Sequence, residues 1–222
     1  MKLAMTGMPL NRSIWLLVAC LALIFLGSAL ILPRTGYGQL NLNFDGIEID
    51  VLHVQGNVYM LVGAGGNITL QVGEEGVLVV DSMYPELADK VLGIIRELSD
   101  QPIRYLINTH VHPDHIGGNA TFAQAGTNFA AGNVAGLIED AADTATIIAH
   151  ENVLLRMSSQ ETPPPFEAWP TDAFFNSSKE VYFNGEAVRV LHQPAAHTDG
   201  DSIVFFRRSD VISTGDLFVT TG

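Results

Sequence analysis

Residues 109–115 (THVHPDH) constrain this chain more than any other feature, because they bring three histidines and a carboxylate within six positions. A predicted strand directly precedes them, and alternate side chains of an extended backbone point the same way. His110 and His112 can therefore reach one metal ion, while Asp114 and His115, where the chain turns toward a helix, can point at a second. Imidazole and carboxylate ligands at this density suit zinc, with iron or manganese as substitutes. The alternative interpretation is a surface histidine cluster without metal.

The N-terminus carries an uncharged apolar run over residues 14–32, preceded by Lys2 and Arg12. A basic start followed by an apolar run is typical of a secretory signal, and small residues before Gln39 fit cleavage there. The same run is long enough to span a bilayer, so an uncleaved anchor is the alternative. We therefore expect residues 1–38 to be a signal peptide or membrane anchor. The protein would be exported to the periplasm, or held at the membrane if the signal is not cleaved.

The charge balance narrows the class of partner. The chain has 24 acidic and 11 basic residues, a formal net charge of −13. Nucleic-acid binding needs a cationic surface, so we expect no nucleic-acid partner. The single cysteine excludes an internal disulfide and a multi-cysteine metal site. We expect a small-molecule substrate and membrane contact only through the N-terminal segment, and the sequence leaves the oligomeric state open.

Apolar segments separated by glycines, and then apolar residues at helical spacing, predict a mixed α/β fold. Strands are expected over residues 47–54, 57–62, 67–72, 76–81, 103–108, 146–149, 181–183, 187–191, 202–206 and 211–213. Helices are expected over residues 87–98, 120–125 and 151–157, with a helix or lid-like insertion over 132–145 and an irregular proline-rich loop over 162–170. Two β-rich halves that each carry helices suggest sheets sandwiched between helical layers.

Three further segments accompany the histidine cluster in a definite order. Asp81 ends a buried strand, His197 lies in AAHTDGDS, and Asp216 lies in STGDLF. With the cluster as the second of four motifs, the sequence resembles the metallo-β-lactamase-fold hydrolase superfamily over about residues 51–218. This resemblance implies an α/β architecture, the αββα four-layer sandwich of that family.

The resemblance also implies a ligand set and a reaction. The ligands comprise three residues for each of two zinc ions: His110, His112 and His197 for one, and Asp114, His115 and Asp216, which bridges both, for the other. Asp81 would accept a hydrogen bond from a ligand histidine and fix its tautomer. The implied activity is that of a zinc-dependent hydrolase, which attacks an ester, thioester, lactone or β-lactam carbonyl with a metal-bound hydroxide. Asp114 is the candidate catalytic residue, as a proton donor to the leaving group. The other three histidines are interpreted as structural: His53, His150 and His192.

The chain departs from the family pattern in one respect. The family supplies a further histidine to the second metal from beyond the fourth motif, whereas this chain ends at Gly222 with no histidine after His197. We therefore expect residues 39–222 to be a metallo-β-lactamase-like domain without its C-terminal elements, which binds the first metal more tightly than the second. The alternative is an exported metal-binding accessory protein, or a degenerate member of the family, without turnover.

Overall fold

The computed structural model describes residues 43–129 and 144–219 of the 222-residue chain. The expected signal peptide or anchor over residues 1–38 lies outside the described residues, as does most of the insertion expected over 132–145. Within the two described ranges, no helix has the length and hydrophobicity that a membrane span requires.

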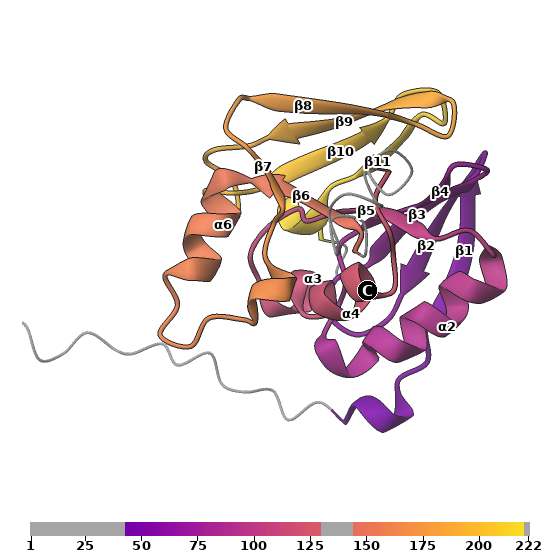
Figure 1. Cartoon of the computed structure of the whole chain (residues 1–222), viewed down its shortest axis with the longest axis horizontal. Coiled ribbons are helices and arrows are strands. Elements are labelled where there is room, and N and C mark those ends of the chain that lie inside the picture. The colour runs from indigo at the N-terminus through magenta and orange to yellow at the C-terminus, as the bar shows by residue number, and fades with distance from the viewer. Residues whose placement is uncertain (1–42, 130–143, 220–222) are drawn as a thin grey trace, which may run out of the picture. The chain divides into compact units, whose positions relative to one another are not determined.

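Seven strands form one mixed sheet in which spatial order follows chain order (Figure 1). The first four pair antiparallel, and the fourth to seventh pair parallel. Their bounds are β1 Asp50–Gln55, β2 Val58–Val62, β3 Ile68–Gly73, β4 Gly76–Val80, β5 Ile103–Ile107, β6 Thr146–His150 and β7 Asp172–Phe174. The apolar β4 is buried along its whole length, as its central place in the sheet requires.

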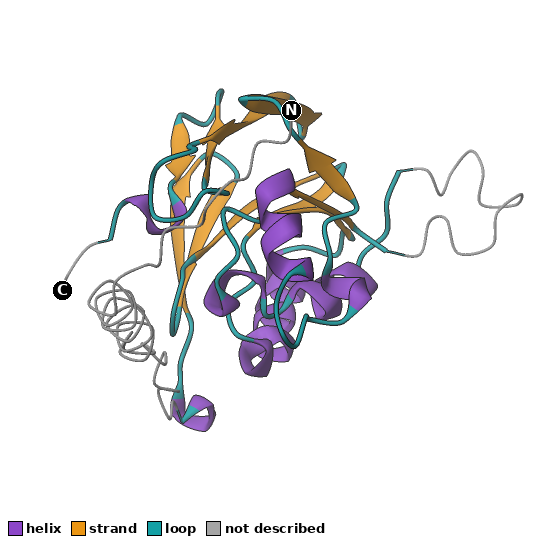
Figure 2. Ribbon diagram, turned by 90° about the vertical axis from the view of Figure 1, so that its left-hand side faces the viewer, coloured by secondary structure: helices purple, strands orange, loops and turns teal. Residues whose placement is uncertain are grey.

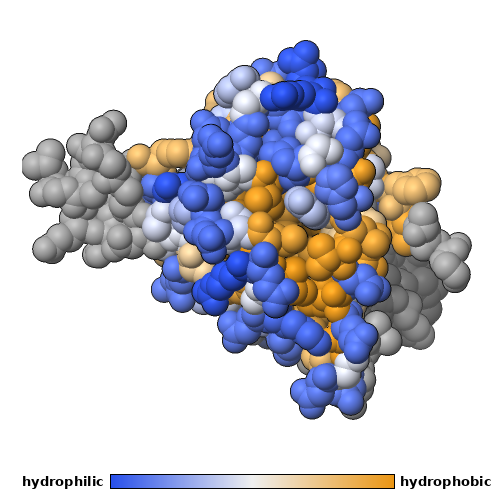
Figure 3. All heavy atoms as spheres, turned by 90° about the vertical axis from the view of Figure 1, so that its right-hand side faces the viewer, coloured by the Kyte–Doolittle hydropathy of each residue, from blue (hydrophilic) through white to orange (hydrophobic). Residues whose placement is uncertain are grey.

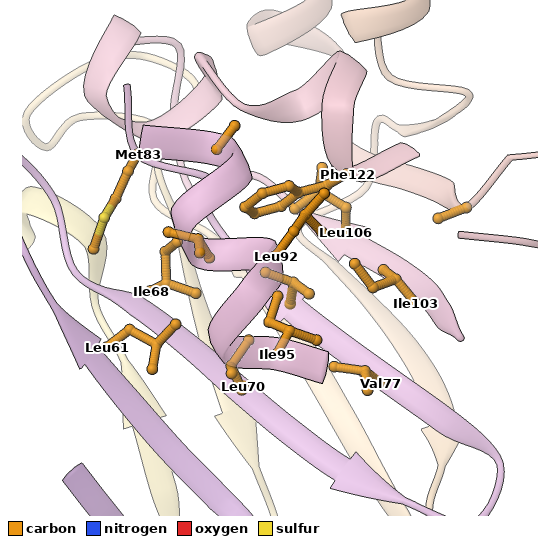
Figure 4. Packing of buried hydrophobic residues seen from close by; sticks show 14 of the residues in the cluster. Leu61, Ile68, Leu70, Val77, Met83, Leu92, Ile95, Ile103, Leu106 and Phe122 are labelled. Carbon is orange, nitrogen blue, oxygen red and sulfur yellow. The ribbon is translucent and has the colours of Figure 1, made fainter. Parts of the chain in front are cut away.

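Helices cover one face of this sheet (Figure 2). They are α2 Ala88–Leu98, α3 Pro113–Ile116, α4 Asn119–Gln124 and α6 Glu151–Ser158, with single 3-10 turns η1 Phe44–Gly46, η2 Pro85–Leu87, η3 Phe166–Ala168 and η4 Gly215–Leu217. The apolar face of α2 packs against the large sheet, where Leu92 and Ile95 point toward the strand residues (Figure 4). The regular apolar spacing in α2 thus forms the core on this side of the sheet.

A four-stranded antiparallel sheet covers the other face, with the order β11-β10-β9-β8. Its bounds are β8 Ser178–Phe183, β9 Glu186–His192, β10 Ser202–Phe206 and β11 Val211–Ser213. Alternate residues such as Val190 and Val204 pack against Leu78 and Val80 of the large sheet. The described residues therefore form helices, sheet and sheet, which confirms the expected α/β sandwich of the metallo-β-lactamase fold. In Figure 1 no described helix covers the outer face of the small sheet.

The edge strand β1 is exposed to solvent along its whole length. Val51, Leu52 and Val54 each expose more than two fifths of their surface. Figure 3 shows hydrophobic side chains gathered on the side of the molecule that carries this edge. The two faces of the large sheet are thus covered well around β4 and poorly at β1.

A buried carboxylate joins the two sheets. Glu186 Oε1 accepts hydrogen bonds from Gln71 Nε2 on β3 and from Ser209 Oγ, each at 2.7 Å. Its Oε2 accepts the backbone N–H groups of Arg208 at 2.8 Å and Ser209 at 3.0 Å. Burial raises the pKa of this carboxyl, but the hydrogen bonds from Ser209, Arg208 and Gln71 outweigh it and hold the pKa below its usual range. The two sheets are therefore linked by an ionised group that has no cationic partner among these contacts.

Candidate metal centre

All six predicted ligands converge, although they come from three parts of the chain. Each segment follows the carboxyl end of a strand: β5 leads to His110, His112, Asp114 and His115, β9 to His197, and β11 to Asp216. Pro113 is the first residue of α3, so the extended backbone that carries the first two histidines turns helical just before Asp114. This local change of conformation separates the cluster into two pairs, as the sequence predicts.

Three histidines and one carboxylate form the first group. His112 Nδ1 lies 3.1 Å from His110 Nε2 and 2.9 Å from His197 Nε2. Asp216 Oδ2 lies 3.9 Å from His110 Nε2 and 3.6 Å from His197 Nε2. Ligand atoms that share one tetrahedral zinc ion, each about 2.0–2.1 Å from it, are about 3.3 Å apart. The four atoms, all within 4.8 Å of one another, therefore have the separations that a common ion needs.

His115 and two carboxylates form the second group. His115 Nε2 lies 3.1 Å from Asp216 Oδ1 and 3.7 Å from Asp114 Oδ2. This nitrogen is buried and has no hydrogen-bond partner among the described residues. A buried polar atom without a partner calls for an explanation, and a cation held between this nitrogen and the carboxylates supplies one. Asp216 thus offers one oxygen to each group.

Asp81 and Thr109 contact the Nδ1 atoms of two ligand histidines, on the side of each ring away from the site. Asp81 Oδ2 lies 2.8 Å from His115 Nδ1, and it accepts a hydrogen bond from Thr109 Oγ1 at 2.7 Å. Thr109 Oγ1 in turn lies 3.1 Å from His110 Nδ1. One buried carboxylate therefore orients His115 directly and His110 through a hydroxyl, which leaves the Nε2 atom of each ring facing the site. Sequence reasoning identified Asp81 but missed Thr109, whose position next to His110 was the available signal.

The surroundings give the histidines opposite pKa shifts. Burial opposes the charged form of His115, but Asp81, Asp114 and Asp216 outweigh it and raise its pKa to about 9. Burial, reinforced by the charge of His115, lowers the pKa of His110 to about 4. Burial and the charge of His197 also lower the pKa of His112. At neutral pH the metal-free site would therefore present two neutral imidazoles to the first ion, while His115 must lose a proton before it binds the second.

The turn between β2 and β3 packs directly on the second group. A Cβ atom at Gly66 would lie 2.4 Å from His115 Cε1, so only glycine lets the backbone approach this closely. The sequence separates the two expected strands by a glycine-rich segment, residues 63–66, and the structure adds its contact with the ring. Beside it lies a hollow of about 370 Å³ that reaches His115 and Asp216 and is lined mainly by polar groups, together with apolar side chains such as Met60 and Ile212.

Comparison with known proteins bears on both the fold and the site. The family model for the metallo-beta-lactamase superfamily matches residues 61–222. A curated linear primary-alkylsulfatase from Pseudomonas sp. (strain ATCC 19151) is 43% identical over 49 residues, which are 22% of this chain and 9% of that protein.

Solved structures with the same fold include both lactamases and a sulfatase. The metallo-β-lactamase MIM-1 from Novosphingobium pentaromativorans is 21% identical with a TM-score of 0.55, over 73% of this chain and 58% of its own. The class B3 di-zinc metallo-β-lactamase LRA-12 from an Alaskan soil metagenome is 16% identical with a TM-score of 0.57, over 75% and 60%. A double mutant of the sec-alkyl sulfatase PisA1 is 15% identical with a TM-score of 0.58, over 76% and 31%.

The chain spans about three fifths of the length of these lactamases and less than a third of the sulfatase. At such identities the likeness shows the fold alone, whereas the family match extends over most of the chain. Strand order, the histidine cluster and the family match agree, and the chain belongs to the metallo-β-lactamase superfamily.

Proposed function

We propose that this protein is a zinc-dependent hydrolase with a two-metal site. The observation that carries the proposal is the convergence of ligand atoms from three chain segments, with Asp216 shared between two groups. One group comprises His110, His112 and His197, and the other comprises Asp114, His115 and Asp216. A set of imidazole and carboxylate ligands without thiolate favours zinc and also accepts iron or manganese.

When bound, divalent ions lower the pKa of a coordinated water toward about 7 and polarise the oxygen of an acyl group. The residues of the chain would bind the metal ions and orient the ligand side chains. Asp81 and Thr109 fix the ligand rings, and Asp216 places negative charge between the two groups. Asp114, whose side chain is partly exposed beside His115, would pass a proton to a leaving group.

The reaction class that we favour is hydrolysis of a carbonyl substrate: an ester, a thioester, a lactone or a β-lactam. The fold likeness to lactamases is compatible with each of these and does not choose between them. A sulfate ester is the second candidate, supported by the 43% identity to an alkylsulfatase over 49 residues. The net charge of −13 argues against a nucleic-acid substrate. The basic start and apolar run before residue 33 support export.

The test separates an enzyme from a metal-binding accessory protein. Zinc content is measured by elemental analysis, and turnover with nitrocefin, a thioester, a lactone and an alkyl sulfate. We expect wild-type protein to bind zinc and to hydrolyse at least one of these substrates. His112→Ala should lose one zinc ion and most turnover. His53→Ala should change neither, because its exposed ring contacts the Gly56 carbonyl oxygen and the Tyr59 ring and no candidate ligand. Zinc binding without any turnover would support the accessory protein, and a His112→Ala variant with wild-type zinc content would contradict the proposed site.

A further inference from the structure

The loop between β9 and β10, residues 193–201, carries His197 and is not part of either sheet. The His197 side chain is more than one third exposed, and the contacts that the structure gives its ring are with other candidate ligands. Its place in the first group therefore depends on what holds the backbone of the loop.

Helix α6 holds the loop at Asp199, two residues after His197. The carbonyl oxygen of Asp199 accepts a hydrogen bond from Asn152 Nδ2 at 2.8 Å and lies 2.9 Å from His192 Nε2. The Asp199 carboxylate is held by both arms of Arg156, with Nε 3.2 Å from Oδ1 and Nη2 2.8 Å from Oδ2. A two-armed contact of this kind fixes orientation as well as distance.

Close packing brings the same two elements together. A Cβ atom at Gly200 would lie 2.9 Å from Cγ2 of the buried Val153 in α6, so the loop backbone rests directly on the helix. Next to it the rings of His150 and His192 stack with centroids 3.4 Å apart and an angle of 11° between their planes. These two histidines, interpreted from sequence as structural, join the end of β9 to the start of α6.

The loop is also tied within itself, so it moves as a unit. Its turn is closed by a hydrogen bond from Thr198 N–H to the Asp201 carboxylate and by one from Gly200 N–H to Thr198 Oγ1. A displacement at Asp199 would therefore be passed to His197. The ligand ring has no similar network of its own among these contacts.

We propose that Asn152 and Arg156 are positioning residues for His197, and that through Asp199 they set the affinity of the first group for its metal ion. The inference rests on the proposed metal site. Without these contacts the loop would spend less time in the conformation that completes the His110, His112 and His197 group. The apparent dissociation constant rises in proportion as the competent fraction falls.

The test is a double-mutant cycle on the full chain, with zinc affinity measured by competition with a chelator. Arg156→Ala removes the two-armed contact and Asp199→Asn removes its negative charge, so each should weaken binding of the first zinc ion by about two- to fivefold, and the double variant should be little weaker than Arg156→Ala. Asn152→Ala, which removes the hydrogen bond to the Asp199 carbonyl oxygen, should also weaken binding of this ion. Leu155→Ala is the matched control, because it shortens an exposed side chain of the same helix and should leave affinity unchanged.

Two further readouts separate positioning from a general loss of structure. The metal-free Arg156→Ala variant should melt at the wild-type temperature, because it removes only an exposed ion pair. The cobalt-loaded variant should have a changed visible spectrum, since that spectrum reports ligand geometry. Wild-type affinity and spectrum in Arg156→Ala, Asp199→Asn and Asn152→Ala would overturn this inference and leave the proposed hydrolase standing. A wild-type protein that binds no zinc would overturn both.

Discussion

Thr109→Val removes one hydroxyl from the buried relay behind His110 and should weaken binding of the first zinc ion about 10- to 100-fold. The valine side chain has nearly the same shape, and the hydrogen bond from the backbone N–H of residue 109 to Asp81 Oδ1, 2.7 Å long, is kept. The contacts that are lost are those of Oγ1 with Asp81 Oδ2 at 2.7 Å and with His110 Nδ1 at 3.1 Å.

The magnitude follows from what the ring must do when a metal is bound. His110 is fully buried and faces the site through Nε2, so its Nδ1 must then carry the proton. In the valine variant that N–H has lost its acceptor, and a buried unsatisfied donor costs about 1–3 kcal/mol. At about 1.4 kcal/mol per tenfold change in affinity, this cost falls in the expected range. In the metal-free protein the His110 proton can lie on Nε2 instead of Nδ1, so most of this cost is avoided.

The assay is zinc competition with a chelator, alongside thermal unfolding of the metal-free protein. Thr109→Ser keeps the hydroxyl and is the matched control, so it should bind zinc nearly as tightly as the wild type. If Thr109→Val bound zinc with wild-type affinity while remaining folded, the hydroxyl would not orient His110. The reasoning from Asp81 through Thr109 would then be wrong.

Two other predictions concern ionisation. The pKa of the Glu186 carboxyl is lowered on folding. Its contribution to stability is therefore present above the unfolded pKa of 4.5 and is lost as the pH falls through the folded pKa. In urea titrations, Glu186→Gln should lower the free energy of unfolding by about 1.5–3 kcal/mol at pH 7, and by less in acid. An unchanged urea midpoint would show that this carboxylate does not link the sheets. Because the pKa of His115 is about 9 and that of His110 about 4, affinity for the second ion should rise with pH from 7 to about 9, while affinity for the first should stay flat. Chelator-buffered cadmium titrations measure both, and equal slopes for the two ions would contradict the assigned protonation states.

The sequence predicts most of the fold because the signals are local. The glycine-bounded hairpins of β2, β3 and β4 and the apolar spacing of α2 occur close to their expected limits. The strand β7 escaped prediction because it has three residues and is formed only by pairing with β6, more than twenty positions earlier.

The candidate site likewise has a part that the sequence predicts and a part that it does not. The cluster at residues 110–115 is visible because its residues are adjacent, and the resemblance adds His197 and Asp216. The supports of the site are contacts between distant parts of the chain, such as that of Arg156 with Asp199, 43 residues later. No periodicity marks such pairs, since each side chain alone looks like an ordinary exposed charge.

The position of Asp216 has a consequence for how the two groups would fill. Its Oδ2 faces the first group and its Oδ1 the second, so a single side-chain rotamer serves both. Whichever cation arrives first immobilises this rotamer and removes that entropic cost from the next binding step, while repulsion between the two cations acts against it. By thermodynamic reciprocity each ion must alter the other's affinity by the same factor. Through this one carboxylate, the binding constant of each ion therefore depends on whether the other ion is already bound.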